Sequence, residues 1–395
     1  MIGDHTRNNS PDFQDLPWDQ PLADWPHLCS RLEQVQHCPS RHPVVFVNYS
    51  GILYAIKELP PGLAQKEYEN LLKMEEHRLP SVTPISYSER STPRGISSFL
   101  ITRYLVASIP YRSLFMRSDL GRYLQPLLDA MAGLLVQLHL AGIFWGDCSL
   151  SNTLFRRDAG ALQAYLVDAE TAEAHTPRLA PVLRHHDLEI MLENVDGDLV
   201  DLEALGHLPK NFPVRETGAS ILERYRRLWE EITRDEVINP DERYRIQERI
   251  RALNALGFSV GDVEIHNSDS GGRLQMRFFI TDRNYYRDQL LGLTGISAGE
   301  MQARQMMNEI NELKAYLSQI NNRSIPLSAA AKHWFENFYQ PVINQLHPII
   351  GQQNANSDPA ELYCQVLENK WFLSERAHQD IGHQAAADDY LRRYG

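Results

Sequence analysis

The stretch from Ile143 to Thr171, IFWGDCSLSNTLFRRDAGALQAYLVDAET, decides how this part of the chain folds and holds most of its reactive side chains. Two short apolar segments, Thr153–Phe155 and Ala164–Val167, are separated by the turn Arg157–Gly160. Apolar segments on both sides of such a turn predict two β-strands. Acidic or amide residues lie just outside each segment, so chemically active groups are expected where the strands begin and end.

Three of these polar residues form an ordered set. Asp147 and Asn152 are five residues apart on a loop, and Asp168 directly follows the second apolar segment. Phosphoryl transfer needs a divalent metal held by oxygen ligands and a carboxylate beside the attacking hydroxyl. Asn152 and Asp168 suit the metal, and Asp147 suits the hydroxyl.

The cation that such chemistry also needs is Lys57, within VVFVNYSGILYAIKEL at residues 44–59. Strands are expected at Val44–Val47 and Ile52–Ile56, with the reversal at Asn48–Gly51. Lys57 at the end of the second strand could neutralise the α and β phosphates of a nucleotide. Glu67 is the preferred acidic partner of this lysine, and Glu69 is the alternative.

Helices and one more strand complete this region. Leu63–His77 has helical spacing and precedes Pro80, and Ser97–Leu105 reads as a strand. Tyr123–Ala141 carries one apolar stripe, and Gly142 is expected to stop that helix. The stripe consists of Leu127, Leu128, Met131, Leu134, Leu135 and Leu138.

At this point the chain resembles the protein-kinase-like superfamily. The superfamily's signatures are a lysine in V-A-I-K, a loop H-x-D-x-x-x-x-N and a metal-binding D-F-G. Here they read YAIK at 54–57, WGDCSLSN at 145–152 and VDAE at 167–170, in the same order. The G-D-x-x-x-x-N form is most similar to small bacterial kinases of the lipopolysaccharide-core and aminoglycoside type. The whole chain resembles a bacterial family in which such a lobe precedes a helical domain of unknown function.

The resemblance implies a bilobal α+β fold with ATP and Mg²⁺ as cofactors. It implies catalytic roles for Asp147 and Lys57, metal binding by Asn152, Asp168 and Glu170, and nucleotide binding by Lys57, Glu67, Gly51, Arg103, Tyr104 and Leu105. The implied activity transfers the γ-phosphate of ATP to a hydroxyl of a small-molecule, glycan or protein acceptor.

Several residues depart from the family pattern. Trp145 stands at the usual histidine, Ala169-Glu170 replaces Phe-Gly, and Gly51 is the single glycine in the turn before the lysine strand. These differences concern the clamping of phosphates more than the binding of metal. A catalytically weak pseudokinase or nucleotide-binding scaffold is therefore the alternative function, and transfer of the AMP portion of ATP is a third.

Composition limits the other function classes. The chain has 395 residues, 43% hydrophobic and 23% charged, with a formal net charge of -12, so bulk nucleic-acid binding is disfavoured. Four scattered cysteines favour a reduced, cytoplasmic setting. No signal peptide or membrane-spanning segment is expected.

Three regions are expected along the chain. Residues 1–41 form an N-terminal arm that docks through Trp18 and Trp25, and residues 42–206 form the kinase-like ATP-binding domain. Residues 207–395 form a mostly helical domain with one β-hairpin, which could serve self-association or a protein partner. Ser297 with Glu300 predicts a capping box for a helix Met301–Ile320, and Asp358 predicts the start of another helix through Phe372. Further helices are expected at Ser220–Thr233 and Asp241–Leu256, and the hairpin turns at residues 268–272.

Overall fold

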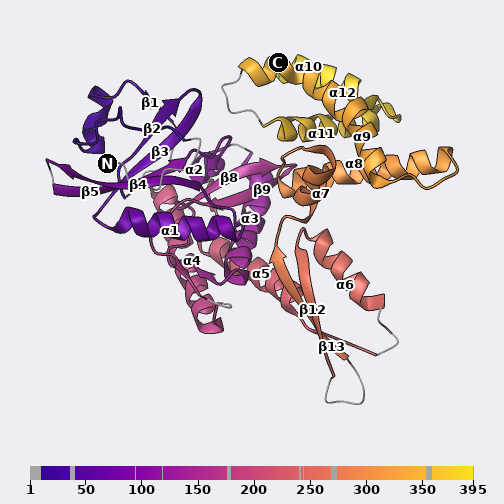
Figure 1. Ribbon diagram of the computed structural model, residues 1–395, viewed down its shortest axis with the longest axis horizontal. Helices are drawn as coiled ribbons and strands as arrows, with labels where there is room; N and C mark the ends of the chain where they lie inside the picture. Colours follow the sequence, from indigo (N-terminus) through magenta and orange to yellow (C-terminus); the bar gives the residue numbers. More distant parts are fainter. Residues whose placement is uncertain are drawn as a thin grey trace. The chain divides into compact units, whose positions relative to one another are not determined.

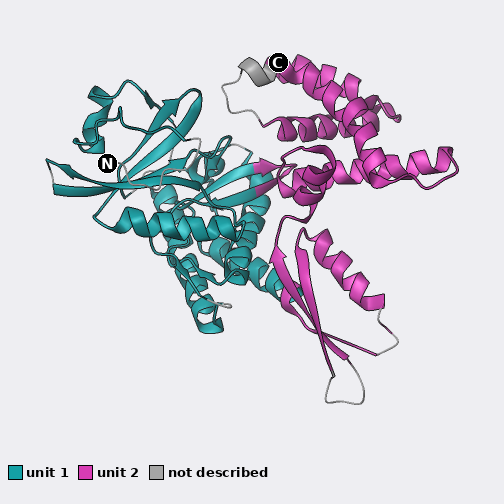
Figure 2. Ribbon diagram, in the orientation of Figure 1, with its two compact units in different colours: residues 1–156, 163–231 teal, residues 157–162, 232–395 magenta. Residues whose placement is uncertain are grey.

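A computed structural model of the protein describes residues 10–35, 41–93, 95–117, 119–175, 179–239, 242, 244–267, 274–352 and 358–394. The chain forms two compact units, which Figure 2 shows in teal and magenta. Unit 1 comprises residues 1–156 and 163–231, and unit 2 comprises residues 157–162 and 232–395. The second segment of unit 1 ends at residue 231, within a helix.

Unit 1 begins with a five-stranded antiparallel sheet of order β1-β2-β3-β5-β4 (Figure 1). Its strands are β1 (Leu32–Glu33), β2 (Val44–Tyr49), β3 (Ile52–Leu59), β4 (Thr83–Thr92) and β5 (Gly95–Arg103). Helix α1 (Leu63–Glu76) packs against β4 and β5. The predicted β2–β3 hairpin, the helix and β5 are confirmed. The sequence prediction missed β4, because Ser, Glu, Arg and Thr after Tyr87 hide its apolar alternation.

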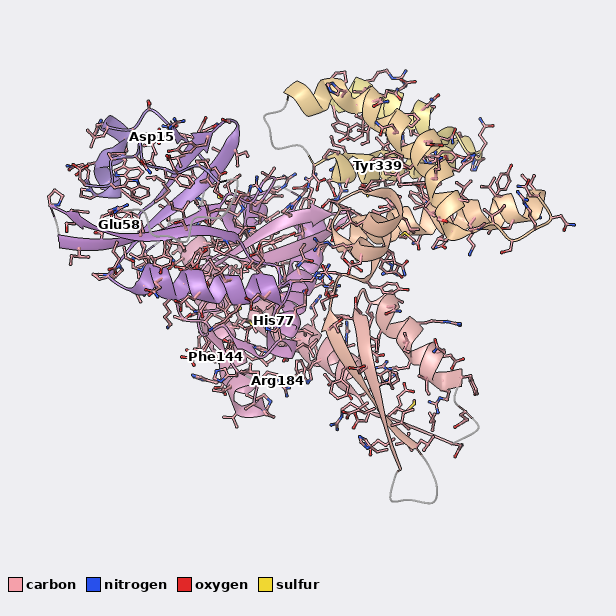
Figure 3. The ribbon with its side chains drawn as sticks, in the orientation of Figure 1. Asp15, Glu58, His77, Phe144, Arg184 and Tyr339 are labelled. Carbon is pink, nitrogen blue, oxygen red and sulfur yellow. The ribbon has the colours of Figure 1, made fainter. Side chains whose placement is uncertain are left out.

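The N-terminal arm covers one part of this sheet. Trp18 and Trp25 are buried in a core with sheet residues such as Ile56 and Phe99, which confirms the expected aromatic docking. A short 3-10 helix, η1 (Leu22–His27), follows this arm's first turn. The backbone N–H of Leu22 donates to Glu58 Oε2 over 2.9 Å, and Figure 3 labels this glutamate. The arm is therefore held by both apolar and polar contacts.

The second lobe of unit 1 is mainly helical. It contains α2 (Tyr111–Phe115), α3 (Leu120–Leu140), α4 (Pro181–Ala204) and α5 (Val214–Thr233). Two small sheets accompany them, β6-β8-β9 and β7-β10, formed by β6 (Ile109–Pro110), β7 (Ile143–Phe144), β8 (Thr153–Asp158), β9 (Ala161–Leu166) and β10 (Glu173–Ala174). The sheet lobe and the helical lobe together confirm the expected bilobal α+β architecture of this part of the chain.

Helix α3 confirms the predicted buried stripe and ends as expected, since Gly142 adopts a left-handed φ of 78°. The sequence prediction missed helix α4. Its buried residues do follow helical spacing, and Pro181 occupies its first turn, where proline is well tolerated. They are Asp187, Leu188, Met191, Val195, Leu199 and Leu202.

Unit 2 contains a three-stranded sheet of order β11-β13-β12 and a helical bundle (Figure 1). The elements are β11 (Glu236–Ile238), α6 (Tyr244–Ala255), β12 (Ser259–Asn267), β13 (Leu274–Asp282), α7 (Tyr285–Thr294), α8 (Glu300–Ile320), α9 (Leu327–Trp334), η2 (Phe335–Tyr339), α10 (Gln340–Gln352), α11 (Pro359–Ala377) and α12 (Gly382–Tyr394). Helices α7 to α12 share one apolar core around Trp334 and Tyr363. The predicted hairpin and helices are confirmed, and the predicted turn at 268–272 lies outside the described residues.

The caps of the two long helices differ in how well local sequence predicts them. Asp358 Oδ1 accepts from the N–H of Ala360 over 3.0 Å, as expected of the cap of α11. The predicted Ser297–Glu300 box is wrong, because Gly299 is the N-cap residue of α8 and Gln302 Oε1 accepts from its N–H over 2.8 Å.

No helix within the described part of the chain is long and apolar enough to cross a membrane.

Candidate active site

Lys57 forms the centre of the candidate site. Its Nζ lies 3.0 Å from Glu67 Oε2 on α1 and 2.8 Å from Asp168 Oδ2, just beyond β9. All three side chains are largely buried, with exposed fractions of 12%, 1% and 20%. The fold therefore brings one cation between two carboxylates that are far apart in sequence. Glu67, and not Glu69, is the partner of this lysine.

The charges of this group depend on one another. Burial alone disfavours the charged lysine, but the carboxylates of Glu67 and Asp168 outweigh it and raise the pKa of Lys57. Lys57 is therefore a fixed positive charge at neutral pH. Glu67 Oε1 also accepts from the backbone N–H of Ala169 over 3.3 Å, which ties α1 to the segment after Asp168.

Asp147 is held by two amide side chains. Asn152 Nδ2 donates to Asp147 Oδ2 and Asn194 Nδ2 donates to Asp147 Oδ1, each over 2.9 Å. Partial burial raises the pKa of Asp147, with the nearby Asp168 acting in the same direction. A carboxylate with a raised pKa is a better proton acceptor than an ordinary aspartate. The arrangement suits a general base with a fixed orientation.

Buried hydrogen bonds hold the loop that carries Asp147. The carboxylate of Asp187 on α4 accepts from the N–H of Trp145 and of Gly146, each over 2.8 Å. It also accepts from His139 Nε2 over 3.1 Å, while His139 Nδ1 lies 2.9 Å from the hydroxyl of Tyr225. Burial lowers the pKa of His139, so the ring is neutral, and the proton assigned to Nε2 completes the network.

Trp145 occupies the position of the family histidine and has a structural role. Its Nε1 donates to the backbone O of Asp168 over 3.0 Å, and its own carbonyl accepts from the hydroxyl of Thr171 over 2.8 Å. The indole is fully buried. It therefore joins the loop of Asp147 to the segment of Asp168 by direct contact.

These groups open onto one cavity of about 470 Å³ in unit 1. The residues of the expected site that line it are Lys57, Arg103, Tyr104, Leu105, Asp147, Asn152 and Asp168. Apolar side chains such as Val44, Phe46 and Val167 line it as well, which is typical of a pocket for a small molecule. Glu67 contacts Lys57 but is not among the described residues that line the cavity.

Two expected site residues lie apart from this cavity. Gly51 is in the β2–β3 turn with a φ of 84° and does not line the cavity within the described residues. Glu170 is not among the described residues that line the cavity, and its carboxylate lies 3.6 Å from Arg41 Nη2 and 3.3 Å from His42 Nε2. The structure thus groups Asn152 with Asp168 but leaves Glu170 outside that pair.

The oxygen atoms of Asn152 and Asp168 fit a magnesium ion that binds together with a nucleotide. Across the described ranges, no group of three or more His, Cys, Asp or Glu side chains could hold a metal. Mg²⁺ is commonly bound by one or two carboxylates, with phosphate oxygens and water as its other ligands. The carboxylate of Asp168 and the amide oxygen of Asn152 supply the hard oxygen donors that this mode requires.

Sequence reasoning missed the contribution of α4. Five of its residues line the cavity on the side of Asp147: Glu193, Asn194, Gly197, Asp198 and Asp201. Asp187 on the same helix holds the loop of Asp147 through the N–H groups of Trp145 and Gly146. The apolar periodicity of α4 could have revealed the helix. Its position beside the loop depends on tertiary packing that the spacing does not encode.

Comparison with known proteins gives matches for both parts of the chain. Residues 53–206 match the lipopolysaccharide kinase (Kdo/WaaP) family, and residues 227–394 match a domain of unknown function, DUF4032. No curated protein matches the chain.

Two solved structures are among those similar to this chain. WaaP in complex with acyl carrier protein has 19% identity and a TM-score of 0.34, with 56% of this chain and 96% of that chain covered. An aminoglycoside-3'-phosphotransferase of type VIII has 16% identity and a TM-score of 0.32, with 50% and 86% covered.

The family matches confirm the resemblance to lipopolysaccharide-core kinases and support a phosphotransferase in general. They also agree with the expectation of a separate C-terminal region of unknown function. The chain is therefore similar to the lipopolysaccharide kinase (Kdo/WaaP) family over residues 53–206 and to DUF4032 over residues 227–394.

Proposed function

We propose that this protein is an ATP- and Mg²⁺-dependent phosphotransferase that moves the γ-phosphate of ATP to a hydroxyl group of an acceptor. The observation that carries the proposal is the buried contact of Lys57 with both Glu67 and Asp168. This group holds one lysine and two carboxyl groups in a largely buried place, and coupled buried charges of this kind cluster at functional sites. A divalent cation beside Asp168 would offset the excess of carboxylates. The match to a kinase family supports phosphotransfer in general.

Each residue has a defined task in this proposal. Lys57, braced by Glu67, neutralises negative charge on the nucleotide phosphates, and Asn152 and Asp168 hold the Mg²⁺. The metal supplies further charge neutralisation at the transferred phosphate. Asp147 accepts the hydroxyl proton while the oxygen of the acceptor forms its bond to the γ-phosphorus. The bond from that phosphorus to the bridging oxygen breaks, and ADP leaves.

The side of the cavity formed by α4 indicates which kind of acceptor would bind there. Glu193 and Asp201 are exposed carboxylates in the lining, and Gly197 lies between them with open space where a side chain would be. Carboxylates near a reacting hydroxyl repel a second anion and accept hydrogen bonds from hydroxyl or amino groups. The proposed acceptor is therefore a neutral or cationic compound rich in hydroxyl or amino groups. The proposed setting is the cytoplasm, where ATP is present.

Calorimetric titration of ATP with and without Mg²⁺, followed by transfer of γ-labelled phosphate to cell metabolites and proteins, tests the proposal. Asp147→Asn should bind ATP as the native protein does and lower turnover by about 10²- to 10⁴-fold. Asp129→Asn, an exposed change on α3, is the matched control.

Different outcomes point to different functions. Native protein that binds ATP with Mg²⁺ but transfers no phosphate would identify a nucleotide-binding scaffold. Label transferred from the α-phosphate, and not from the γ-phosphate, would identify AMP transfer. Native turnover in Asp147→Asn would remove Asp147 from the proposed role.

A further inference from the structure

The β8–β9 hairpin carries both proposed metal ligands at its base. Asn152 directly precedes β8, and Asp168 lies two residues after the end of β9. The two strands are hydrogen-bonded neighbours, and the N–H of Val167 donates to the carbonyl of Asn152 over 3.1 Å. The relative position of Asn152 and Asp168 therefore depends on how this hairpin is held.

The tip of the same hairpin belongs to unit 2, and Figure 2 shows it in the colour of that unit. Asp158 ends β8 and has only 2% of its surface exposed. Its Oδ2 accepts from the N–H of Met301 over 3.0 Å, and its Oδ1 accepts from the N–H of Gln302 over 2.8 Å. A carboxylate from the hairpin thus caps the first turn of α8.

A second set of contacts surrounds this cap. The N–H of Ala159 donates to Glu361 Oε2 over 3.0 Å, and Gln302 Nε2 donates to the same oxygen over 3.0 Å. Glu361 lies in the first turn of α11. The tip is therefore fastened to the beginnings of two helices of unit 2.

Gly299 shows how closely this junction is packed. A Cβ at this position would lie 2.4 Å from Asp158 Oδ1, a distance that real Cβ atoms do not show. The φ of Gly299 is -67°, an ordinary value for any residue, so its backbone does not require glycine. The required feature is the space for the Asp158 carboxylate.

We propose that Asp158 is a positioning residue for Mg²⁺ and ATP binding, because it fastens the hairpin of Asn152 and Asp168 to the N-terminus of α8. The DUF4032 region thereby contributes to the kinase site without providing a residue that touches the nucleotide. This inference rests on the proposed function for its metal-binding part.

The physical basis is the mechanical continuity of the hairpin. A charged cap satisfies N–H groups that would otherwise lack an acceptor, and it interacts favourably with the positive end of the helix. Loss of the cap frees the tip, and the hydrogen-bonded strands then open more often towards their base. Asn152 and Asp168 would spend less time in the arrangement that a metal needs.

Hydrogen exchange of the full-length protein tests the mechanical part directly. Asp158→Asn keeps the shape of the side chain but loses one of the two acceptor oxygens that cap α8. It should therefore raise the rate of amide exchange throughout β8 and β9. Gly299→Ala displaces the same carboxylate and should have a similar effect. Gly292→Ala is its matched control, because a Cβ at Gly292 meets no atom within 4 Å.

A control is also needed for general destabilisation of unit 2. Glu309 accepts from Trp334 Nε1, Tyr363 Oη and His383 Nε2 over 3.0, 2.8 and 2.9 Å, within the helical core. Glu309→Gln should weaken this core without raising exchange in β8 and β9. Equal exchange of these strands in Asp158→Asn and native protein would overturn the proposal, as would an equal increase in Glu309→Gln.

The Mg²⁺ concentration needed for half-maximal ATP binding tests the functional part. Asp158→Asn should raise it by about two- to thirtyfold, the range expected for a coupling residue remote from the ligand. An unchanged value would refute the positioning role. Native protein that binds no ATP would refute the proposed function together with this functional part, and the exchange data would still decide whether Asp158 holds the hairpin.

Discussion

Replacement of Asp187 by asparagine removes the group that fixes the loop of the proposed base. The carboxylate is fully buried and accepts from the N–H groups of Trp145 and Gly146 and from Nε2 of His139. An asparagine has one acceptor oxygen, and its NH₂ group must face at least one of these donors. A buried donor left without an acceptor costs about 1–3 kcal/mol, so Asp187→Asn should lose at least this much free energy of unfolding.

Asp187→Asn should also lower the turnover of the proposed phosphoryl transfer. A loop displaced at Trp145 and Gly146 moves the neighbouring Asp147, and a misplacement of about 1 Å can lower turnover by about 10²-fold. Urea unfolding followed by hydrogen exchange of the amides of α3 and α4 gives the stability of unit 1, and transfer of γ-labelled phosphate gives the turnover.

Asp201→Asn is the stability control for this experiment. Asp201 lies on the same helix and is exposed, so its change should alter the free energy of unfolding by less than about 0.5 kcal/mol. The reasoning fails if Asp187→Asn unfolds at the same urea concentration as Asp201→Asn.

Three further predictions concern other parts of the chain. Trp25→Ala should lower the stability of unit 1 by about 3–5 kcal/mol, because it removes a fully buried indole, and a loss below 1 kcal/mol in urea unfolding would contradict this. Trp145→Phe should lower the free energy of unfolding by about 1–3 kcal/mol, because the carbonyl of Asp168 loses its hydrogen-bond donor. If the role of the indole is structural, Trp145→His should be as unstable in urea unfolding as Trp145→Phe. Burial raises the pKa of Glu300 from an ordinary 4.5 to about 7, so the folded protein keeps this proton longer than the unfolded chain. The free energy of unfolding of unit 2 should therefore fall as pH rises from 4.5 to 7 and then level off, and Glu300→Gln should lack this component in calorimetry across that range.

The elements that carry the candidate site could be predicted because local signals mark them. Lys57 ends an apolar strand, Asp147 and Asn152 share one loop, and Asp168 follows another strand. Alternation, turn residues and fixed spacing within a few residues are visible in a single sequence. These four side chains do line one cavity, although their chemical roles stay predictions.

Other features depend on contacts between distant segments, which spacing does not encode. The N-cap of α8 was misassigned because its acceptor, Asp158, lies more than 140 residues earlier in the chain. Glu170 was expected as a further metal ligand, but its carboxylate lies beside Arg41 and His42 and is not in the cavity lining. Asn194 was missed since it acts from a helix whose apolar stripe was overlooked.

The path of the chain through the two units has a practical consequence for dissecting the protein. Residues 157–162 fold with unit 2, yet they interrupt unit 1 in sequence, so no single cut separates the units. A protease nick between α5 and β11 should leave fragments that co-elute in gel filtration. A truncated chain that stops at residue 231 would lack α8 and α11, and the carboxylate of Asp158 would face solvent without its amide donors.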